Sequence, residues 1–100
     1  MPGESRATTA HTIIRRWTED RGGIPSTRRE NGHAEVGSLQ IRFPQLNGDG
    51  AYEELDWETF FEEFDKSNLV MVFQEENGRG DRSHFYRFFR REERAFAMPE

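Results

Sequence analysis

Apolar residues recur at three- and four-residue spacing in two stretches of this chain, the pattern of a helix with one buried face. The first stretch contains Ala10, Ile13, Ile14 and Trp17. Thr8 or Thr9 can cap a helix there, and we predict that it runs to about Arg21. Gly22 follows the last turn and suits the left-handed conformation that ends many helices.

The second amphipathic stretch has a clear start and a clear end. Asp56 is a good N-cap residue, and Leu55 and Phe60 are spaced to pack together across the first turn. The aromatic stripe that follows consists of Phe60, Phe61 and Phe64. We predict a second helix that begins after Asp56 and ends at Asn68.

Between the two predicted helices the pattern is weaker. Residues 39–43 alternate apolar and polar side chains, which predicts a half-buried strand that Pro44 ends. Residues 24–36 alternate poorly. We interpret them as a mobile loop or a short edge hairpin with its turn at Asn31-Gly32.

After the second predicted helix the chain has the pattern of a hairpin. Residues 69–73 form a continuous apolar run, which is typical of a strand covered on both faces. Residues 76–82 contain the turn pair Asn77-Gly78 and predict the connection. An aromatic-rich strand over residues 83–91 completes the predicted hairpin.

The predicted order is therefore helix, strand, helix and hairpin. These elements bury their apolar sides in an α+β fold in which two helices pack on one face of a small, mainly antiparallel sheet. We predict one domain over residues 8–91, a disordered N-terminus over residues 1–7 and a loose C-terminal tail over residues 92–100. The expected core residues are Trp17, Phe60, Phe61, Phe64, Val70, Val72 and Phe85.

Composition limits the cellular compartments and the kinds of bonding that this domain can have. The 100 residues include no cysteine, which excludes disulfides and thiolate metal sites. No apolar run approaches the roughly 18–20 residues that span a bilayer, and residues 1–10 lack the apolar segment of a secretory signal. We expect a cytoplasmic protein without a membrane partner.

No residue pattern predicts catalysis. A nucleophilic enzyme needs a base-activated Ser, Thr or Cys, and neither Ser38 nor Ser83-His84 lies in a nucleophile-elbow motif. The carboxylates of the second predicted helix lie on one exposed face, whereas catalytic acids need a cleft or a like-charged neighbour. His11, His33 and His84 lack the i, i+4 spacing of a helical metal site. We therefore expect no catalytic residue, no metal and no cofactor.

Six short motifs between residues 8 and 89 carry a family resemblance. They are His11-x-x-Ile14-x-x-Trp17-x-Glu19-x-Arg21-Gly22-Gly23-x-Pro25, Leu39-x-Ile41-x-Phe43-Pro44, Trp57-x-x-Phe60-Phe61-x-x-Phe64, Asn68-Leu69, Phe73-Gln74-Glu75 and Ser83-x-Phe85. In these motifs the chain resembles a family of small uncharacterised bacterial proteins, some of which are labelled 1,4-α-glucan branching enzymes.

The resemblance implies an ordered domain and no particular activity. Glucan branching is done by large (β/α)₈ barrels, which take about 250 residues, and 100 residues are too few to form one. Two positions depart from the family pattern. Arg42 stands where relatives carry an acid, and Tyr86-Arg87 replaces an Asn-Lys pair. The resemblance therefore implies no shared surface chemistry around these two predicted strands.

The distribution of charge suggests a function of binding rather than catalysis. Residues 47–76 carry ten acids and one Lys, whereas the segments before and after them each carry two more arginines than acids. An acidic helix face can select a basic partner by charge complementarity. We interpret the chain as a non-catalytic protein–protein interaction module with an unidentified protein partner. The candidate contacts are Arg21, Gly22, Gly23, Pro25, Glu58, Glu62 and Glu63.

Two alternatives stay open. Arg21 either pairs with an acid such as Glu19 and is structural, or contacts the partner. The whole chain is alternatively a nucleic-acid-associated accessory protein, because arginines bind phosphates and exposed rings stack on bases. Its net charge of −5 argues against this function. The candidate nucleic-acid contacts are Arg15, Arg16, Arg28, Arg29, Arg87, Arg90 and Arg91.

Overall fold

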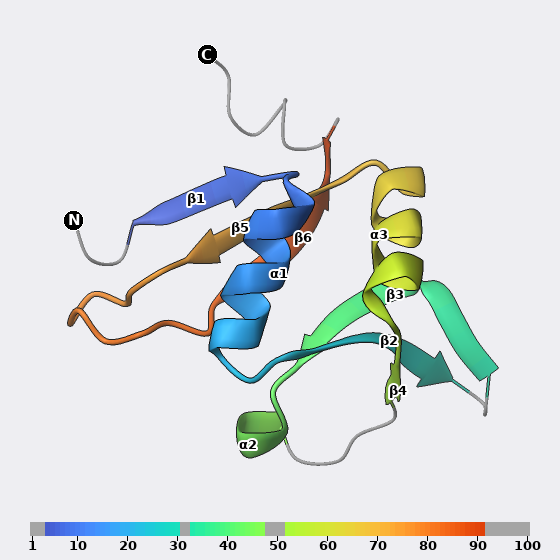
Figure 1. Ribbon diagram of the computed structural model, residues 1–100, viewed down its shortest axis with the longest axis horizontal. Coiled ribbons are helices and arrows are strands. Elements are labelled where there is room, and N and C mark those ends of the chain that lie inside the picture. The colour runs from blue at the N-terminus through green and yellow to red at the C-terminus, as the bar shows by residue number, and fades with distance from the viewer. Residues whose placement is uncertain (1–3, 31–32, 48–51, 92–100) are drawn as a thin grey trace.

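The chain folds into two antiparallel sheets rather than the single sheet that the sequence predicted. The computed structural model describes residues 4–30, 33–47 and 52–91. In this part of the chain, each sheet has three strands and the helices pack against both sheets (Figure 1). The α+β class is confirmed, and the arrangement of two helices on one face of one sheet is wrong.

The first sheet contains the predicted hairpin and one strand that we did not predict. Its strands are β1 (Ser5–Thr8), β5 (Leu69–Gln74) and β6 (Tyr86–Arg90), in the order β1-β5-β6. β5 is buried along most of its length, as its apolar run predicted. β1 forms where we expected a disordered end, because the apolar β5 offers it a free edge for backbone hydrogen bonds. Residues 1–3 and 92–100, the rest of the two predicted loose ends, lie outside the described residues.

The second sheet contains β2 (Ile24–Glu30), β3 (His33–Arg42) and β4 (Tyr52–Glu54), in the order β3-β2-β4. β2 is its central strand and pairs with β3 as an antiparallel hairpin. Of our two interpretations of residues 24–36, the mobile loop is wrong; the hairpin is present, but it is long and β2 is not at the edge of the sheet. The apolar–polar pattern did not predict this strand, because polar side chains such as Ser26 and Thr27 occupy its buried positions. The turn predicted at residues 31 and 32 lies outside the described residues.

Both predicted helices are present, together with one short helix that was not predicted. They are α1 (His11–Asp20), α2 (Pro44–Asn47) and α3 (Trp57–Lys66). Asp56 caps α3 as predicted, since its side chain accepts a 2.7 Å hydrogen bond from the Thr59 N–H. The predicted threonine cap of α1 is wrong, because Ala10 holds the cap position and the Thr8 hydroxyl accepts from the Ala10 N–H instead.

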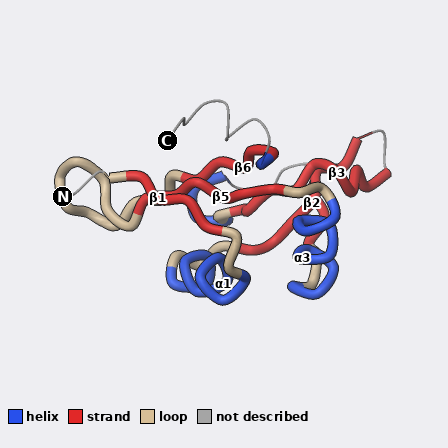
Figure 2. The backbone as a smooth tube through the Cα atoms, turned by 90° about the horizontal axis from the view of Figure 1, so that it is seen from above, coloured by secondary structure: helices blue, strands red, loops and turns tan. Residues whose placement is uncertain are grey.

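α1 and α3 lie on the same side of the sheets, and Figure 2 shows both below the strands. Aromatic side chains fill the space between these layers. Trp17 of α1 lies edge-on to Phe73 of β5, and its indole N–H donates 2.8 Å to the carbonyl oxygen of Gln74. The buried core cluster consists of Ile14, Trp17, Leu39, Ile41, Phe43, Phe60, Phe64, Met71 and Phe73.

Most of the predicted core residues are confirmed, and one is wrong. The buried ones are Trp17, Phe60, Phe64, Val70 and Val72. Phe61 is half-buried and packs against the core cluster. Phe85, by contrast, is 38% exposed and lies on the surface.

Tyr86 joins the two sheets. Its ring packs against Trp17 and Phe43 in the interior. Its hydroxyl accepts a 3.0 Å hydrogen bond from the Ile41 N–H of β3 and lies 3.1 Å from the Ile41 carbonyl oxygen. The backbone edge of β3 is therefore satisfied by a side chain at this point, and β6 is held beside β3.

Candidate binding surface

β6 presents a row of exposed side chains on the side of its sheet that faces away from α1. Successive residues of a strand point to opposite faces. Tyr86 and Phe88 point inward to the core cluster, so Arg87 and Phe89 point outward, and Phe85, the residue before β6, is exposed as well. Phe85 is 38% exposed and Phe89 is 37% exposed. We call this side of the sheet the outer face.

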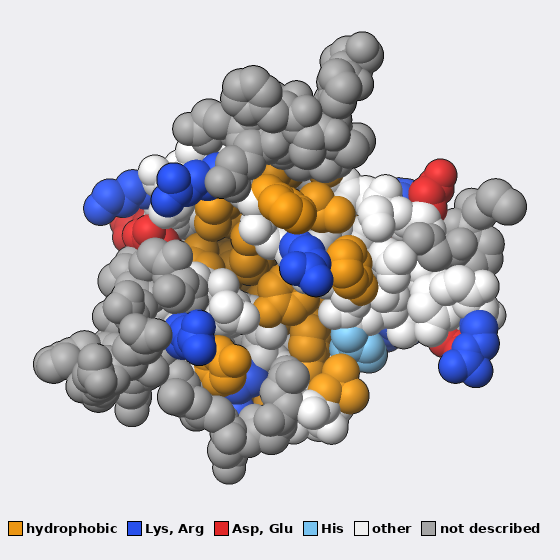
Figure 3. Space-filling model, turned by 180° about the vertical axis from the view of Figure 1, so that it is seen from behind, with side chains coloured by type: hydrophobic (Ala, Val, Ile, Leu, Met, Phe, Trp, Pro, Cys, Tyr) orange, Lys and Arg blue, Asp and Glu red, His pale blue; other side chains and the backbone are white. Residues whose placement is uncertain are grey.

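The neighbouring strands continue the outer face with small and apolar residues, of which Val70 and Val72 are themselves buried. The register places Val72 beside Arg87, Val70 beside Phe89, and Ala7 of β1 beside Val72. Figure 3 views the molecule from this side and shows hydrophobic side chains gathered at its middle, with Lys or Arg side chains among and around them. Neither α1 nor α3 covers the outer face, because both lie on the other side of the strands (Figure 2).

The charge of this sheet is opposite in sign to the charge of the whole chain. The strands β1, β5 and β6 carry three arginines, Arg6, Arg87 and Arg90, and no Asp or Glu. Arg91 follows directly and donates 3.1 Å to the carbonyl oxygen of Leu69. The Arg87 guanidinium lies 5.9 Å from the centroid of the Phe85 ring. An acidic protein therefore has a basic, aromatic sheet.

A shallow groove of about 550 Å³ runs along β6 beside β3. Its lining residues are Leu39, Gln40 and residues 84–89. Its neutral polar side chains are those of Gln40, His84 and Tyr86. The Gln40 carboxamide oxygen lies 3.2 Å from the Tyr86 hydroxyl, which leaves the Gln40 NH₂ group without a hydrogen bond among the described residues.

His84 is held in the groove by packing rather than by hydrogen bonds. Its ring stands edge-on to Phe43, with the ring centroids 5.0 Å apart. Burial lowers the pKa of His84 below its usual value, and the positive charges of Arg21 and Arg82 lower this pKa further. The imidazole is therefore neutral at pH 7, with one nitrogen that donates and one that accepts a hydrogen bond.

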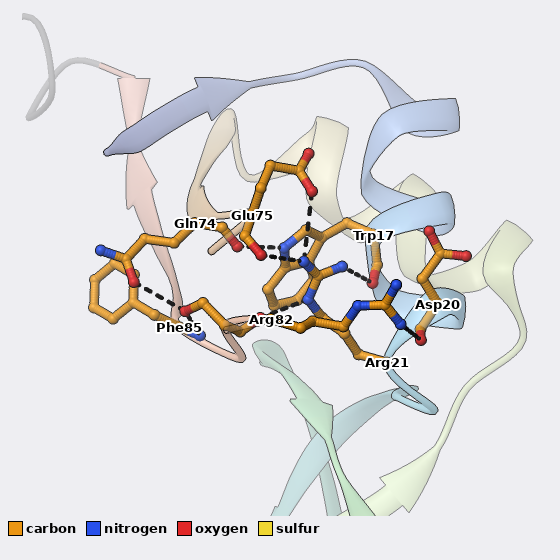
Figure 4. A network of polar contacts seen from close by, with 8 residues as sticks. Trp17, Asp20, Arg21, Gln74, Glu75, Arg82 and Phe85 are labelled. Atoms are coloured by element: carbon orange, nitrogen blue, oxygen red, sulfur yellow. Dashed lines mark hydrogen bonds and ion pairs between the residues drawn. The ribbon is translucent and has the colours of Figure 1, made fainter. Parts of the chain in front are cut away.

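Arg21, a predicted partner contact, is an interior residue. Its side chain is only 3% exposed, and its guanidinium donates to the carbonyl oxygens of Ser83, Trp17 (3.0 Å) and Glu75 (2.9 Å). It also lies 4.4 Å from the centroid of the Trp17 ring. Figure 4 shows the guanidinium enclosed between α1 and the β5–β6 hairpin. Of the two roles left open for Arg21, the structural one agrees with this geometry, although its acidic partner is Glu75 and not Glu19.

The residues after Arg21 are structural as well. Gly22 has a φ of +69°, which a side chain would strain, and it ends α1 as predicted. A Cβ atom at Gly23 would lie 2.8 Å from the Thr18 side chain, so the chain packs too closely here for any other residue. Pro25 is buried in β2. Since Arg21 and Pro25 are also buried, the loop from residue 21 to residue 25 has little surface to offer a partner.

The predicted acidic contacts lie on α3, on the side of the molecule away from the outer face (Figure 2). Glu58 and Glu62 are exposed, stand one turn apart, and have no ion pair among the described residues. Glu63 is half-buried and accepts a 2.6 Å hydrogen bond from the Ser67 hydroxyl, so it closes the end of the helix.

The remaining predicted arginines are scattered. Arg15 pairs with Glu19 at 3.0 Å on α1, and Arg16 lines a separate groove of about 300 Å³ between β1 and α1. Arg28 is exposed on β2, and the side chain of Arg29 lies outside what the structure describes. Only Arg87, Arg90 and Arg91 share one strand end with exposed rings.

Other kinds of site lack support in the described part of the chain. Residues 4–30, 33–47 and 52–91 contain no group of three or more His, Asp or Glu side chains placed to hold a metal ion. No helix in these ranges is long and apolar enough to cross a membrane. No protein-family model, curated protein or solved structure matches this chain. The resemblance to small bacterial proteins therefore stays a prediction.

The sequence identified the arginines of this surface but not its polar groove residues. It selected Arg87, Arg90 and Arg91 and noticed the rings between them, but it placed Phe85 in the core. It did not select Gln40 or His84. The alternation of residues 39–43 does mark Gln40 as a polar position of a half-buried strand, but only the contact between β3 and β6 places it near the rings.

Proposed function

We propose that this chain is a non-catalytic domain that binds single-stranded nucleic acid on the outer face. One observation carries the proposal: Phe85, Arg87 and Phe89 stand in one exposed row on a sheet whose strands carry arginines and no acids. Exposed rings stack on unpaired bases, and arginines between them contact the phosphates. Four residues along a strand separate the two rings by about 13 Å, so each ring serves a different base.

The net charge of −5 does not oppose this function, because the charges are segregated. The free carboxylates of Glu58 and Glu62 lie on α3, across the core from the outer face. Charges in solution are screened over a distance of about 8–10 Å at physiological salt. Of the strand arginines, Arg87 lies on the outer face, whereas the register places Arg6 beside Phe73 and Arg90 beside Leu69 on the other face. A nucleic-acid strand on the outer face therefore meets Arg87 more strongly than the distant acids.

The direct test is fluorescence anisotropy of labelled single-stranded DNA and RNA, titrated with the full chain over a range of salt concentrations. We expect saturable binding whose logarithm falls linearly with the logarithm of the salt concentration. Stacking contributes about 1–3 kcal/mol per base, so Phe85→Ala should weaken binding about 5- to 150-fold. Arg87→Ala should lower the salt slope by about 0.7, the value for one phosphate contact on a single strand.

Arg16→Ala is the matched control, because it removes the same charge from α1, on the other side of the sheet. It should change neither the affinity nor the salt slope beyond a small general effect. Duplex DNA should bind more weakly than either single strand, since its bases are already stacked. Equal losses in Arg16→Ala and Arg87→Ala would show that binding depends on net charge alone and would overturn the proposal.

A second candidate is a protein–protein interaction through α3, favoured by the two free carboxylates of Glu58 and Glu62. One turn apart on an exposed face, they suit a basic partner. Affinity capture with the wild-type chain would be compared with capture by Glu58→Gln combined with Glu62→Gln. Glu63 is left intact because it bonds to Ser67.

The control for this second candidate is the double change Glu54→Gln and Glu76→Gln, which removes two exposed carboxylates elsewhere. A partner lost with the α3 changes and kept with the control supports the candidate. If all three proteins capture the same partners, the second candidate function is wrong.

A further inference from the structure

Two neutral polar side chains in the groove between β6 and β3 have hydrogen-bonding groups that no described residue satisfies. The NH₂ group of Gln40 and both ring nitrogens of His84 have no hydrogen bond among the described residues. Both side chains line the same groove as Phe85, the exposed residue that follows His84 in the chain. Aromatic surface with a few converging polar groups is the usual character of a binding pocket for a small ring.

Tyr86 makes the position of Gln40 specific. Its hydroxyl lies 3.2 Å from the Gln40 carboxamide oxygen and is itself held by the backbone of Ile41. The oxygen of the carboxamide is thereby turned toward the protein, and its NH₂ group is the part that a ligand can reach. At this position Gln40 is a donor of hydrogen bonds.

A nucleobase stacked on Phe85 would present its edge to these two side chains. The bases differ in the groups along that edge. Guanine, thymine and uracil carry a carbonyl oxygen next to a ring N–H, whereas adenine and cytosine carry an amino group next to a ring nitrogen that accepts. The carbonyl oxygen is the complement of a donor at Gln40, and the ring N–H is the complement of an accepting nitrogen on His84.

We propose that this groove recognises the edge of one unpaired base through Gln40 and His84 and prefers guanine, thymine and uracil to adenine and cytosine. The inference rests on the proposed function, because the base must first be held on the outer face. The lowered pKa of His84 supports it, since a protonated imidazole has no accepting nitrogen. The occupant is a nucleic acid rather than a protein, because the side chains that line the groove include Arg87 and no Asp or Glu.

The experiment compares oligouridylate with oligocytidylate of equal length, by anisotropy, on the full chain. Uracil and cytosine have the same ring size and differ at the edge in question, so the ratio of their affinities reports edge recognition rather than stacking. We expect the wild-type protein to bind oligouridylate about fivefold more tightly, the effect of one hydrogen bond. Guanine against adenine at a single position of a mixed oligonucleotide should show the same preference.

Two variants test the residues. Gln40→Glu keeps an oxygen for the Tyr86 hydroxyl but replaces the donor with an acceptor, so the ratio should fall below one. His84→Phe keeps a ring against Phe43 and removes the accepting nitrogen, so the ratio should fall toward one. The negative charge added in Gln40→Glu lowers the affinity for both oligonucleotides equally, so it does not change the ratio of the two affinities.

The outcomes separate this inference from the proposed function. Absence of saturable binding to either oligonucleotide would overturn the proposed function, and this inference with it. Binding with a wild-type ratio near one, or with a ratio that Gln40→Glu leaves unchanged, would overturn the inference alone. A preference for oligocytidylate in the wild-type protein would also overturn it.

Discussion

Replacement of Arg21 by alanine should destabilise the fold strongly, because the buried guanidinium is bonded on several sides. The guanidinium donates to three carbonyl oxygens, those of Trp17, Ser83 and Glu75, and so ties the end of α1 to the β5–β6 hairpin. Its side chain is 3% exposed, so water does not replace these bonds without rearrangement. The perturbation therefore removes the main polar link between the helix and the sheet.

The magnitude follows from these contacts. A hydrogen bond with a charged donor contributes about 1.5–3 kcal/mol, so three such bonds set a ceiling of roughly 4–9 kcal/mol. Burial of the guanidinium offsets part of this, as the lowered pKa of Arg21 indicates. The net loss should be about 3–5 kcal/mol, as for other broken buried ionic contacts. In a domain of this size, that lowers Tm by at least about 12 °C.

Urea and thermal unfolding, followed by circular dichroism and by tryptophan fluorescence, measure this loss. Arg82→Ala is the matched control, because Arg82 is exposed and also bonds to the end of α1, with Nη1 2.8 Å from the carbonyl oxygen of Asp20. It should cost less than about 0.5 kcal/mol, as most surface changes do. An Arg21→Ala protein that unfolds at the wild-type temperature would refute the assignment of Arg21 to a structural role and restore it as a candidate contact.

Three further predictions concern the core and the groove. Phe64→Ala should cost about 3–5 kcal/mol in urea unfolding, because the ring is fully buried between α3 and the sheets; an unchanged midpoint would mean that α3 is misplaced. Gly23→Ala should cost about 1–3 kcal/mol, since the new Cβ would approach the neighbouring side chains to within 2.8–2.9 Å. Gly78→Ala, with nothing within 4 Å of the added Cβ, should unfold like the wild type, and equal effects at both glycines would contradict the packing argument. The folded pKa of His84 is below its unfolded value of about 6.5, so its contribution to stability is present above that pH and is lost as the pH falls through the folded pKa. In His84→Phe this loss should be absent, which shows as a smaller drop of Tm between about pH 7.5 and pH 5.5 than in the wild type; an identical drop would remove His84 as its cause.

The predictions from sequence succeeded where one short segment carried its own signal. The cap at Asp56 and the aromatic stripe after it defined α3, and the apolar run over residues 69–73 defined β5. They failed where a segment takes its structure from a neighbour. β2 is polar along much of its length and is a strand because it pairs on both sides, with β3 and with β4.

The direction of the side chains on the outer face likewise depends on a neighbouring strand. Residues 85–90 place rings at both odd and even positions, so the pattern of β6 is compatible with either face inward. The contact of the Tyr86 hydroxyl with Ile41, on a distant strand, fixes which face it is. This decision sends Phe85 and Phe89 to the surface and Tyr86 and Phe88 to the core.

The sequence alone predicted the α+β class, both main helices, the hairpin after them and the arginines of β6. These depend on caps, turns and periodicity, which act over a few residues. Tertiary contacts set the division into two sheets, the burial of Arg21 and the placement of Gln40 and His84 in one groove with the exposed rings. Those features depend on contacts between residues far apart in the chain, such as Arg21 with Ser83 and Gln40 with Tyr86, about which local periodicity carries no information.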